Sequence, residues 1–270
     1  MEPGSLDEWQ ALIRRFLRDH LERSGAKGVV IGISGGIDSS LTAALCVDAF
    51  GVDRVRAVLM PHRDSDPDDL AAGQALCAHL GLESHVRDIT PIVDGVNATL
   101  PGLDAAALGN AKARARMMTL YAEAQTHGLL VCGTGNKSEL LVGYFTKHGD
   151  GGVDLEPIGD LYKTQVWSLA RHMGLPADLV DRTPSAGLVA GQTDEQDLGM
   201  SYEALDAVLK CIELNTPEHQ IPDRTGASVD VVGRVLRMVR RSEHKRHAAL
   251  IPKIGARTVG IDWRRSVHWD

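Results

Sequence analysis

Apolar residues along the chain fall into two alternating patterns: short continuous runs and longer stretches with helical spacing. The first run, Gly28 to Ile33, reads GVVIGI. Such a β-branched run is typical of a strand buried on both faces of a parallel sheet. Similar runs recur, and we predict strands over 28–33, 54–60, 84–89 and 129–132. Between them, apolar residues at helical spacing predict helices over 9–23, 37–50, 68–80 and 104–126.

Strands that alternate with helices predict an α/β fold with a doubly wound parallel sheet and helices on both faces. The second half has a different pattern. Residues 133–163 and 183–199 are polar and glycine-rich without a clear period, and such long irregular stretches are usually functional or disordered. Helical patterns return over 164–173, 201–211 and 228–246. Because no change in composition marks a linker, we expect a single domain over residues 1–270.

Composition narrows the class of protein. Apolar residues make up 43% of the chain and the net charge is −7, so a basic footprint for nucleic acid is not expected. The four cysteines form no CxxC pair, and we expect buried thiols in a reducing compartment. The first ten residues do not form a signal peptide and no long apolar run predicts a membrane span. We therefore expect a cytoplasmic protein without a nucleic-acid or membrane partner.

The first strand leads into a loop rich in small residues and then into a helix. The loop reads Gly32-Ile33-Ser34-Gly35-Gly36-Ile37-Asp38-Ser39-Ser40. Small residues allow a ligand to approach the backbone, and the helix N-terminus favours an anion. Asp38 would repel a bare phosphate, but it suits a magnesium ion that is itself bound to phosphate. The loop is neither a Walker A motif nor a GxGxxG fingerprint. A simple capped turn is the alternative.

The segment SGGIDSS resembles the loop of the ATP pyrophosphatases, which hold the pyrophosphate end of ATP while the α-phosphate is attacked. Further segments resemble one family of that superfamily, the ammonia-dependent NAD synthetases. These segments read NAKARARM from Asn110, GTGNKSE from Gly133, GYFTKHGDGGVD from Gly143, PIGDLYKTQV from Pro157, TPSAGL from Thr183, GQTDE from Gly191 and HKR from His244. Their order and number make the resemblance specific over about residues 9–250.

The resemblance implies a set of site residues. ATP would be bound by the loop residues Gly32, Ile33, Ser34, Gly35, Gly36, Ile37, Asp38 and Ser39, together with Thr134, Lys163 and Ser185. Deamido-NAD would be bound by Arg114, Lys147, Asp154, His244 and Lys245. Asp38 and Glu139 would share Mg²⁺, and with Lys163 they would form the catalytic group. Taken one at a time, several of these charges are equally typical of a solvated surface.

The resemblance also implies a reaction. The nicotinate carboxylate of deamido-NAD would attack ATP, pyrophosphate would leave, and ammonia would displace AMP from the acyl-adenylate to give NAD. Segments 147–152 and 183–195 would close over the substrates. The synthetase motifs leave no space for a glutamine amidase domain, so free ammonia is the expected donor. Homodimers with substrate sites at the interface are expected as well. The alternatives are an RNA-thiolating enzyme, a non-catalytic nucleotide sensor and an NAD-dependent oxidoreductase.

Overall fold

A computed structural model describes residues 4–182, 193–259 and 262–263. Its sheet has four parallel strands in the order β3-β2-β1-β4. The strands are β1 (Gly28–Gly32), β2 (Val55–Leu59), β3 (Ser84–Val86) and β4 (Leu129–Cys132). Val29 pairs with Val55 on one side, and Gly28 pairs with Leu129 on the other. The predicted parallel α/β sheet is therefore confirmed, with β1 in its interior.

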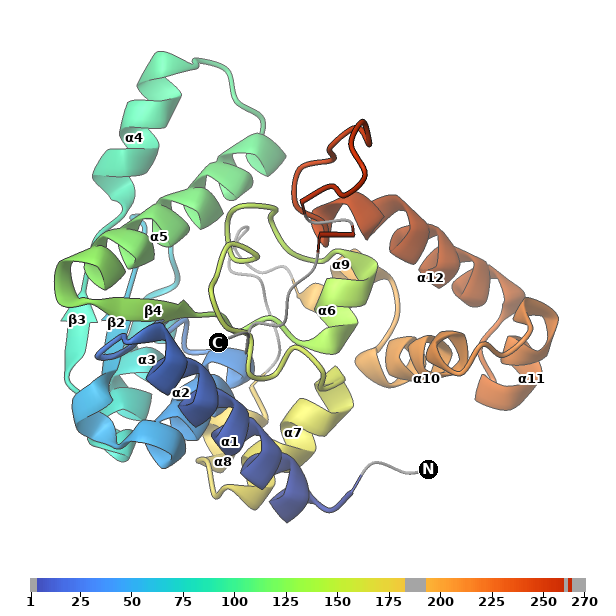
Figure 1. Cartoon of the computed structure of the whole chain (residues 1–270), viewed down its shortest axis with the longest axis horizontal. Helices are drawn as coiled ribbons and strands as arrows, with labels where there is room; N and C mark the ends of the chain where they lie inside the picture. The colour runs from blue at the N-terminus through green and yellow to red at the C-terminus, as the bar shows by residue number, and fades with distance from the viewer. Residues whose placement is uncertain (1–3, 183–192, 260–261, 264–270) are drawn as a thin grey trace.

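Helices cover both faces of this sheet (Figure 1). On one face, Val29 and Ile31 pack in a cluster with α1 (Leu6–Ser24), α2 (Ile37–Phe50), α3 (Pro67–Leu80) and α7 (Lys163–His172). On the other face, Val30 packs with α4 (Thr90–Thr99) and α5 (Ala105–His127). Successive strand side chains point to opposite faces, so a strand covered on both sides must be apolar at every position. This requirement explains the unbroken run GVVIG.

The C-terminal half adds a helical layer beside the sheet (Figure 1). It contains α10 (Tyr202–Glu213), α11 (Ile221–Thr225) and α12 (Val229–Ser242), which pack with the short α6 (Lys137–Val142) around an apolar cluster of their own. Two further short helices are α8 (Ala177–Val180) and α9 (Asp194–Leu198). Short 3₁₀ turns cover Val52–Arg54, Glu218–Gln220 and Glu243–Lys245.

The predicted elements differ from the observed ones at several places. The third strand ends at Val86 instead of 89, and α4 begins directly afterwards at Thr90. This helix is missing from the sequence prediction, as are α6, α8, α9 and α11. They are short or, in α4, contain Pro91 and Gly95, so their periodicity is weak. The last helix ends at Ser242, short of the predicted 246, and continues as a 3₁₀ turn.

Within the described ranges, no helix is both long and apolar enough to cross a membrane. The single domain over 1–270 stays a prediction.

Candidate active site

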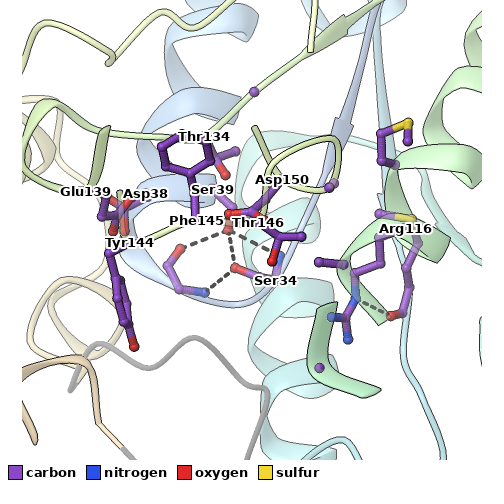
Figure 2. A pocket seen from close by; sticks show the side chains of 18 of the residues that line it. Ser34, Asp38, Ser39, Arg116, Thr134, Glu139, Tyr144, Phe145, Thr146 and Asp150 are labelled. Carbon is purple, nitrogen blue, oxygen red and sulfur yellow. Dashed lines mark hydrogen bonds between the residues drawn. The ribbon is translucent and has the colours of Figure 1, made fainter. Parts of the chain in front are cut away.

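A cavity of about 720 Å³ opens at the carboxyl ends of the strands. It is lined by Gly32 at the end of β1, Met60 after β2 and Gly133 after β4. Ligands of open α/β sheets bind at this edge because loops from several strands meet there. Figure 2 shows side chains from the loop after β1, from α5 and from the loop 143–152 around the same space.

The predicted phosphate loop forms one wall of this cavity. All of its residues from Gly32 to Ser39 line the space. The loop is held by its own hydroxyls: Ser34 Oγ and Ser39 Oγ are 3.0 Å apart, and Ser39 Oγ donates to the Gly36 carbonyl at 2.9 Å. Gly36 is the N-cap of α2 and no side chain caps this helix. The first N–H groups of α2 are therefore available to an anion, as the sequence predicts.

Three charged side chains at the starts of three helices meet beside this loop. Lys163 of α7 directs its Nζ to the carboxylate of Asp38 in α2, and this nitrogen lies 3.5 Å from Oε1 of Glu139 in α6. Asn136, the N-cap of α6, donates from Nδ2 to the second oxygen of Asp38 at 3.0 Å. We call Asp38, Asn136, Glu139 and Lys163 the charge cluster. It joins segments that are 98 and 125 positions apart in the sequence.

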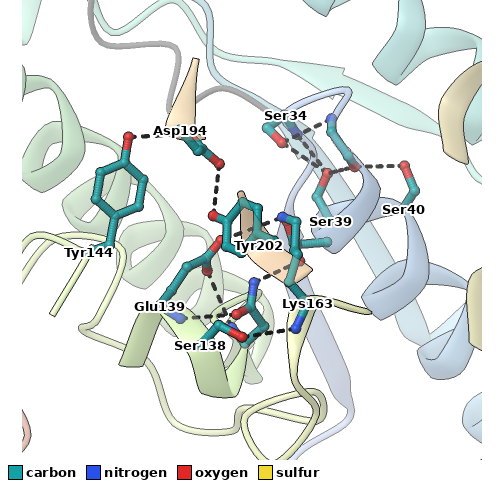
Figure 3. A network of polar contacts seen from close by, with 12 residues as sticks. Ser34, Ser39, Ser40, Ser138, Glu139, Tyr144, Lys163, Asp194 and Tyr202 are labelled. Atoms are coloured by element: carbon teal, nitrogen blue, oxygen red, sulfur yellow. Dashed lines mark hydrogen bonds and ion pairs between the residues drawn. The ribbon is translucent and has the colours of Figure 1, made fainter. Parts of the chain in front are cut away.

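Further polar groups surround the charge cluster (Figure 3). The Ser138 hydroxyl accepts from the Lys163 amide at 2.9 Å and donates to Asp206 at 2.5 Å. The ring of Tyr202 lies 5.1 Å from Lys163 Nζ, and its hydroxyl donates to Asp194 at 3.1 Å. Lys163 is 1% exposed. An ammonium buried to this degree needs partners with opposite charge, and the cluster supplies them.

Burial and neighbouring charges both shift the pKa values of Lys163 and Glu139 in this cluster. Burial lowers the pKa of Lys163, but the Asp38 and Glu139 carboxylates outweigh it and raise the pKa above the ordinary lysine value. Burial and the charge of Asp38 raise the pKa of Glu139, and Lys163 only partly offsets them. Burial, reinforced by the charge of Asp38, therefore favours the protonated form of Glu139, and a cation bound beside it would favour the charged form.

The carboxylate pair fits one mode of magnesium binding. In the described part of the chain, no three His, Cys, Asp or Glu side chains lie together as a metal cage. Mg²⁺ is commonly held by one or two carboxylates together with substrate phosphates and water. Asp38 and Glu139 both line the cavity beside the phosphate loop, so their placement agrees with this mode.

The structure brings together four of the five residues that the resemblance assigns to deamido-NAD. Arg114 donates to the Lys147 carbonyl at 3.3 Å, and Lys147 Nζ donates to the His244 carbonyl at 2.6 Å. Lys245 Nζ donates to the carbonyls of Gly143 and Phe145 at 2.7 and 2.6 Å. These contacts fasten the loop after α6 to the C-terminal segment. Of the four, Lys245 lines the cavity.

Two other predicted site residues are separate from this group. Asp154 lies against β4 and α5. Its carboxylate accepts hydrogen bonds from the Val131 amide at 2.8 Å and from the Tyr121 hydroxyl at 3.0 Å. Ser185 lies outside the described residues, as does most of the segment 183–195. Thr134 lines the cavity as predicted. The ligand contacts of all these residues stay predictions.

Several residues of the site have no role in the prediction from the sequence. Asn136 is fully buried and links α6 to Asp38; the spacing of Asn136 and Glu139 matches a capping box and was an available signal. Arg116, which donates to the Met60 carbonyl at 3.1 Å, and Arg182 both line the cavity. Asp194 is 4% exposed and binds the hydroxyls of two tyrosines. Apart from this capping box, their roles depend on contacts between distant segments, which no local pattern reveals.

The comparisons with known proteins agree with one another. The NAD synthase family model matches residues 9–249. The NH(3)-dependent NAD(+) synthetase of Methanosarcina mazei is 49% identical over 253 residues, which is 92% of this chain and 99% of that protein. The structure of NMN synthetase from Francisella tularensis has a TM-score of 0.82 and 34% identity, and that of the NH3-dependent NAD synthetase from Campylobacter jejuni has 0.79 and 30%. Each similarity covers 93% of this chain and 100% of the other.

The fold thus defines a Rossmann-like α/β protein with a cavity at the carboxyl edge of its parallel sheet. The chain belongs to the NAD synthase family, and within it to the ammonia-dependent NAD synthetases. The resemblance inferred from the motifs is confirmed. The protein is a ligase of NAD biosynthesis that forms NAD from deamido-NAD, ammonia and its co-substrate ATP.

Glu156 lies beside Gly133 and Gly135, in the loop after β4, and its carboxyl group has an unusual environment. A Cβ built on Gly135 would lie 3.2 Å from Glu156 Oε1, so the carboxyl group lies against the loop after β4. Burial, and secondarily the charge of Asp150, raise the pKa of Glu156 from its ordinary 4.5 to about 7. Because the folded state binds this proton more tightly than the unfolded state, the group makes folding less favourable as the pH rises from about 4.5 to 7.

We therefore expect Glu156→Gln to stabilise the protein at pH 8 and to leave stability unchanged at pH 4. The gain should be up to roughly 3 kcal/mol, the order set by a pKa that rises from 4.5 to about 7. Urea unfolding at both pH values measures it, with the exposed Glu203→Gln in α10 as the control. Equal effects at pH 4 and pH 8 would show that Glu156 is not preferentially protonated in the folded protein.

Proposed function

We propose that this enzyme activates the nicotinate carboxylate of deamido-NAD as an acyl-adenylate in the described cavity. One observation supports this most directly: the uncapped N-terminus of α2 and the charge cluster face the same space. The helix N-terminus favours the phosphates of ATP. A lysine and a carboxylate pair beside them suit a reaction in which negative charge builds up on a departing pyrophosphate.

In the first step, one carboxylate oxygen of deamido-NAD forms a bond to the α-phosphorus of ATP. The bond from this phosphorus to the bridging oxygen breaks, and pyrophosphate leaves with the electron pair. The amides at the start of α2, which no side chain caps, would stabilise the leaving group. Lys163, fixed beside the loop by Asp38, adds positive charge from a position that needs no rearrangement.

In the second step, ammonia forms a bond to the activated carbonyl carbon. AMP leaves with the electron pair of the carbon–oxygen bond, and the nitrogen loses a proton to give the amide. Water competes with ammonia for the acyl-adenylate, so the cavity must be closed during this step. Segments 147–152 and 183–195 are the proposed closing segments, the first of which borders the cavity through Gly149, Asp150 and Gly152.

Mg²⁺ held by Asp38 and Glu139 would neutralise phosphate charge when it is bound. Without it, the raised pKa of Glu139 means that this carboxyl tends to keep its proton. Thr134 and Ser185 are proposed to contact ATP. Arg114, Lys147, Asp154, His244 and Lys245 are proposed to contact deamido-NAD.

The proposed function is tested by NAD formation from deamido-NAD, Mg-ATP and ammonium, coupled to a dehydrogenase. Asp38→Ala should lower kcat/KM at least about a hundredfold, because it unpairs Lys163 and removes a metal ligand. Chelation of Mg²⁺ should stop the wild-type reaction, and glutamine should not replace ammonium. The exposed Asp53→Ala, remote from the cavity, is the matched control and should retain activity.

A second substrate makes this assay more decisive. One structural relative is described as an NMN synthetase, so nicotinate mononucleotide is the appropriate competitor of deamido-NAD. We expect deamido-NAD to be preferred. Amidation of the mononucleotide at the higher kcat/KM would contradict the proposed substrate, and failure with both would contradict the reaction.

We further propose that the enzyme is a homodimer whose deamido-NAD sites lie at the subunit interface. Arg114 and Asp154 are exposed and lie outside the cavity lining, so a second subunit is needed if they are to enclose a ligand. Sedimentation equilibrium at micromolar concentration should give twice the mass of 29.1 kDa. A fully active protein with the monomer mass would contradict this arrangement.

A further inference from the structure

Arg182 contacts the phosphate loop from a distant part of the chain. It follows α8, and its Nη1 donates to the Gly35 carbonyl at 3.3 Å. Its Nη2 forms an ion pair with Asp69 of α3 at 2.8 Å. The side chain is 28% exposed and lines the cavity. The guanidinium group is therefore fixed against the loop and open to the ligand space.

The backbone of Gly35 makes this close approach possible. Gly35 has a φ of 82°, which favours glycine. A Cβ at this position would lie 2.4 Å from the Asp69 carbonyl and 3.2 Å from Arg182 Nη1. A larger residue would therefore separate the loop from α3 and from Arg182. The first glycine of the SGG segment, Gly35, thus allows a cation to lie beside the loop.

The other basic residues around the cavity have different positions. In the described ranges, the basic cavity residues are Arg116, Lys163, Arg182 and Lys245. Lys245 binds the carbonyls of the loop after α6, and Arg116 binds the carbonyl of Met60. Lys163 lies between two carboxylates. Of these four, Arg182 is the one that hydrogen-bonds the backbone of the phosphate loop.

Arg182 has the chemistry to hold an anion there without losing its present partner. A guanidinium has five N–H donors in a planar fork, so it can bind a carboxylate and a phosphate at once. The loop otherwise offers neutral N–H and hydroxyl donors, together with the negative charge of Asp38. Burial raises the pKa of Asp69, and Arg182 opposes that rise. This pairing holds the arginine in place before a ligand arrives.

We propose that Arg182 binds the pyrophosphate portion of ATP and the pyrophosphate product. This inference rests on the proposed function, because it assigns a further ligand residue to the same site. Two phosphate groups carry negative charge that the loop alone does not neutralise. Arg182, held against the Gly35 carbonyl, supplies a fixed positive charge beside the loop.

The test is calorimetric binding of magnesium pyrophosphate and, separately, of AMP to the whole protein. Arg182→Gln should weaken pyrophosphate binding about tenfold or more, the size expected for a lost charged hydrogen bond. AMP binding should change less than about twofold. Arg182→Lys, which keeps the charge but not the fork, should give an intermediate loss. If the Arg182→Gln variant does not fold, the pyrophosphate affinity of Arg182→Lys tests the proposal in its place.

Arg171→Gln is the matched control, because it removes an exposed arginine that pairs with Asp181, the residue next to Arg182. It should leave both affinities unchanged. Equal losses of pyrophosphate and AMP binding in the Arg182 variants would indicate only a structural role and would overturn the proposal. Unchanged pyrophosphate affinity in the Arg182 variants would overturn the proposal as well. So would a wild-type protein that does not bind pyrophosphate. Because binding is measured without turnover, a failure of NAD formation is recognised separately in the wild-type assay.

Discussion

The site depends on one buried ion pair, that between Lys163 and Asp38. A lysine that is 1% exposed would be unfavourable without it, and its removal would leave an uncompensated charge. The pair also determines geometry, because the two residues lie in the first turns of α7 and α2, 125 positions apart. Asn136 and Glu139 add the start of α6 to the same point. The phosphate loop, the loop after β4 and the C-terminal layer are thus fixed relative to one another by a few polar contacts.

The segment after α12 holds α6 and the loop that follows it. Arg246 donates to the carbonyls of Leu140 and Leu141 at 2.9 and 2.7 Å, which are among the last carbonyls of α6. With Lys245, it joins the end of α12 to the helix that carries Glu139. Residues of the HKR segment therefore support the loop after α6 directly. A contact with deamido-NAD is an additional role that the resemblance implies for His244 and Lys245.

The sequence predicted the sheet and the phosphate loop because both have strong local patterns. An apolar run such as GVVIG is typical of a strand covered on both faces, as in a parallel sheet, and the SGGIDSS segment follows it closely. The helices α4, α6 and α11 were not predicted, because short elements acquire stability from packing rather than from their own periodicity. Asn136 and Arg182 were not recognised because their partners, Asp38 and Gly35, are far away in the sequence. Family resemblance identified Lys163, but its partners became apparent only in the structure.

The central claim is that this cavity activates a carboxylate by transferring AMP to it. The most direct test uses deamido-NAD labelled with ¹⁸O in its carboxylate, together with unlabelled ATP and ammonium. The account predicts that one labelled oxygen appears in AMP for each NAD formed and that pyrophosphate stays unlabelled. Label in pyrophosphate or inorganic phosphate, or NAD formed with unlabelled AMP, would contradict attack at the α-phosphorus and with it the assigned role of the phosphate loop.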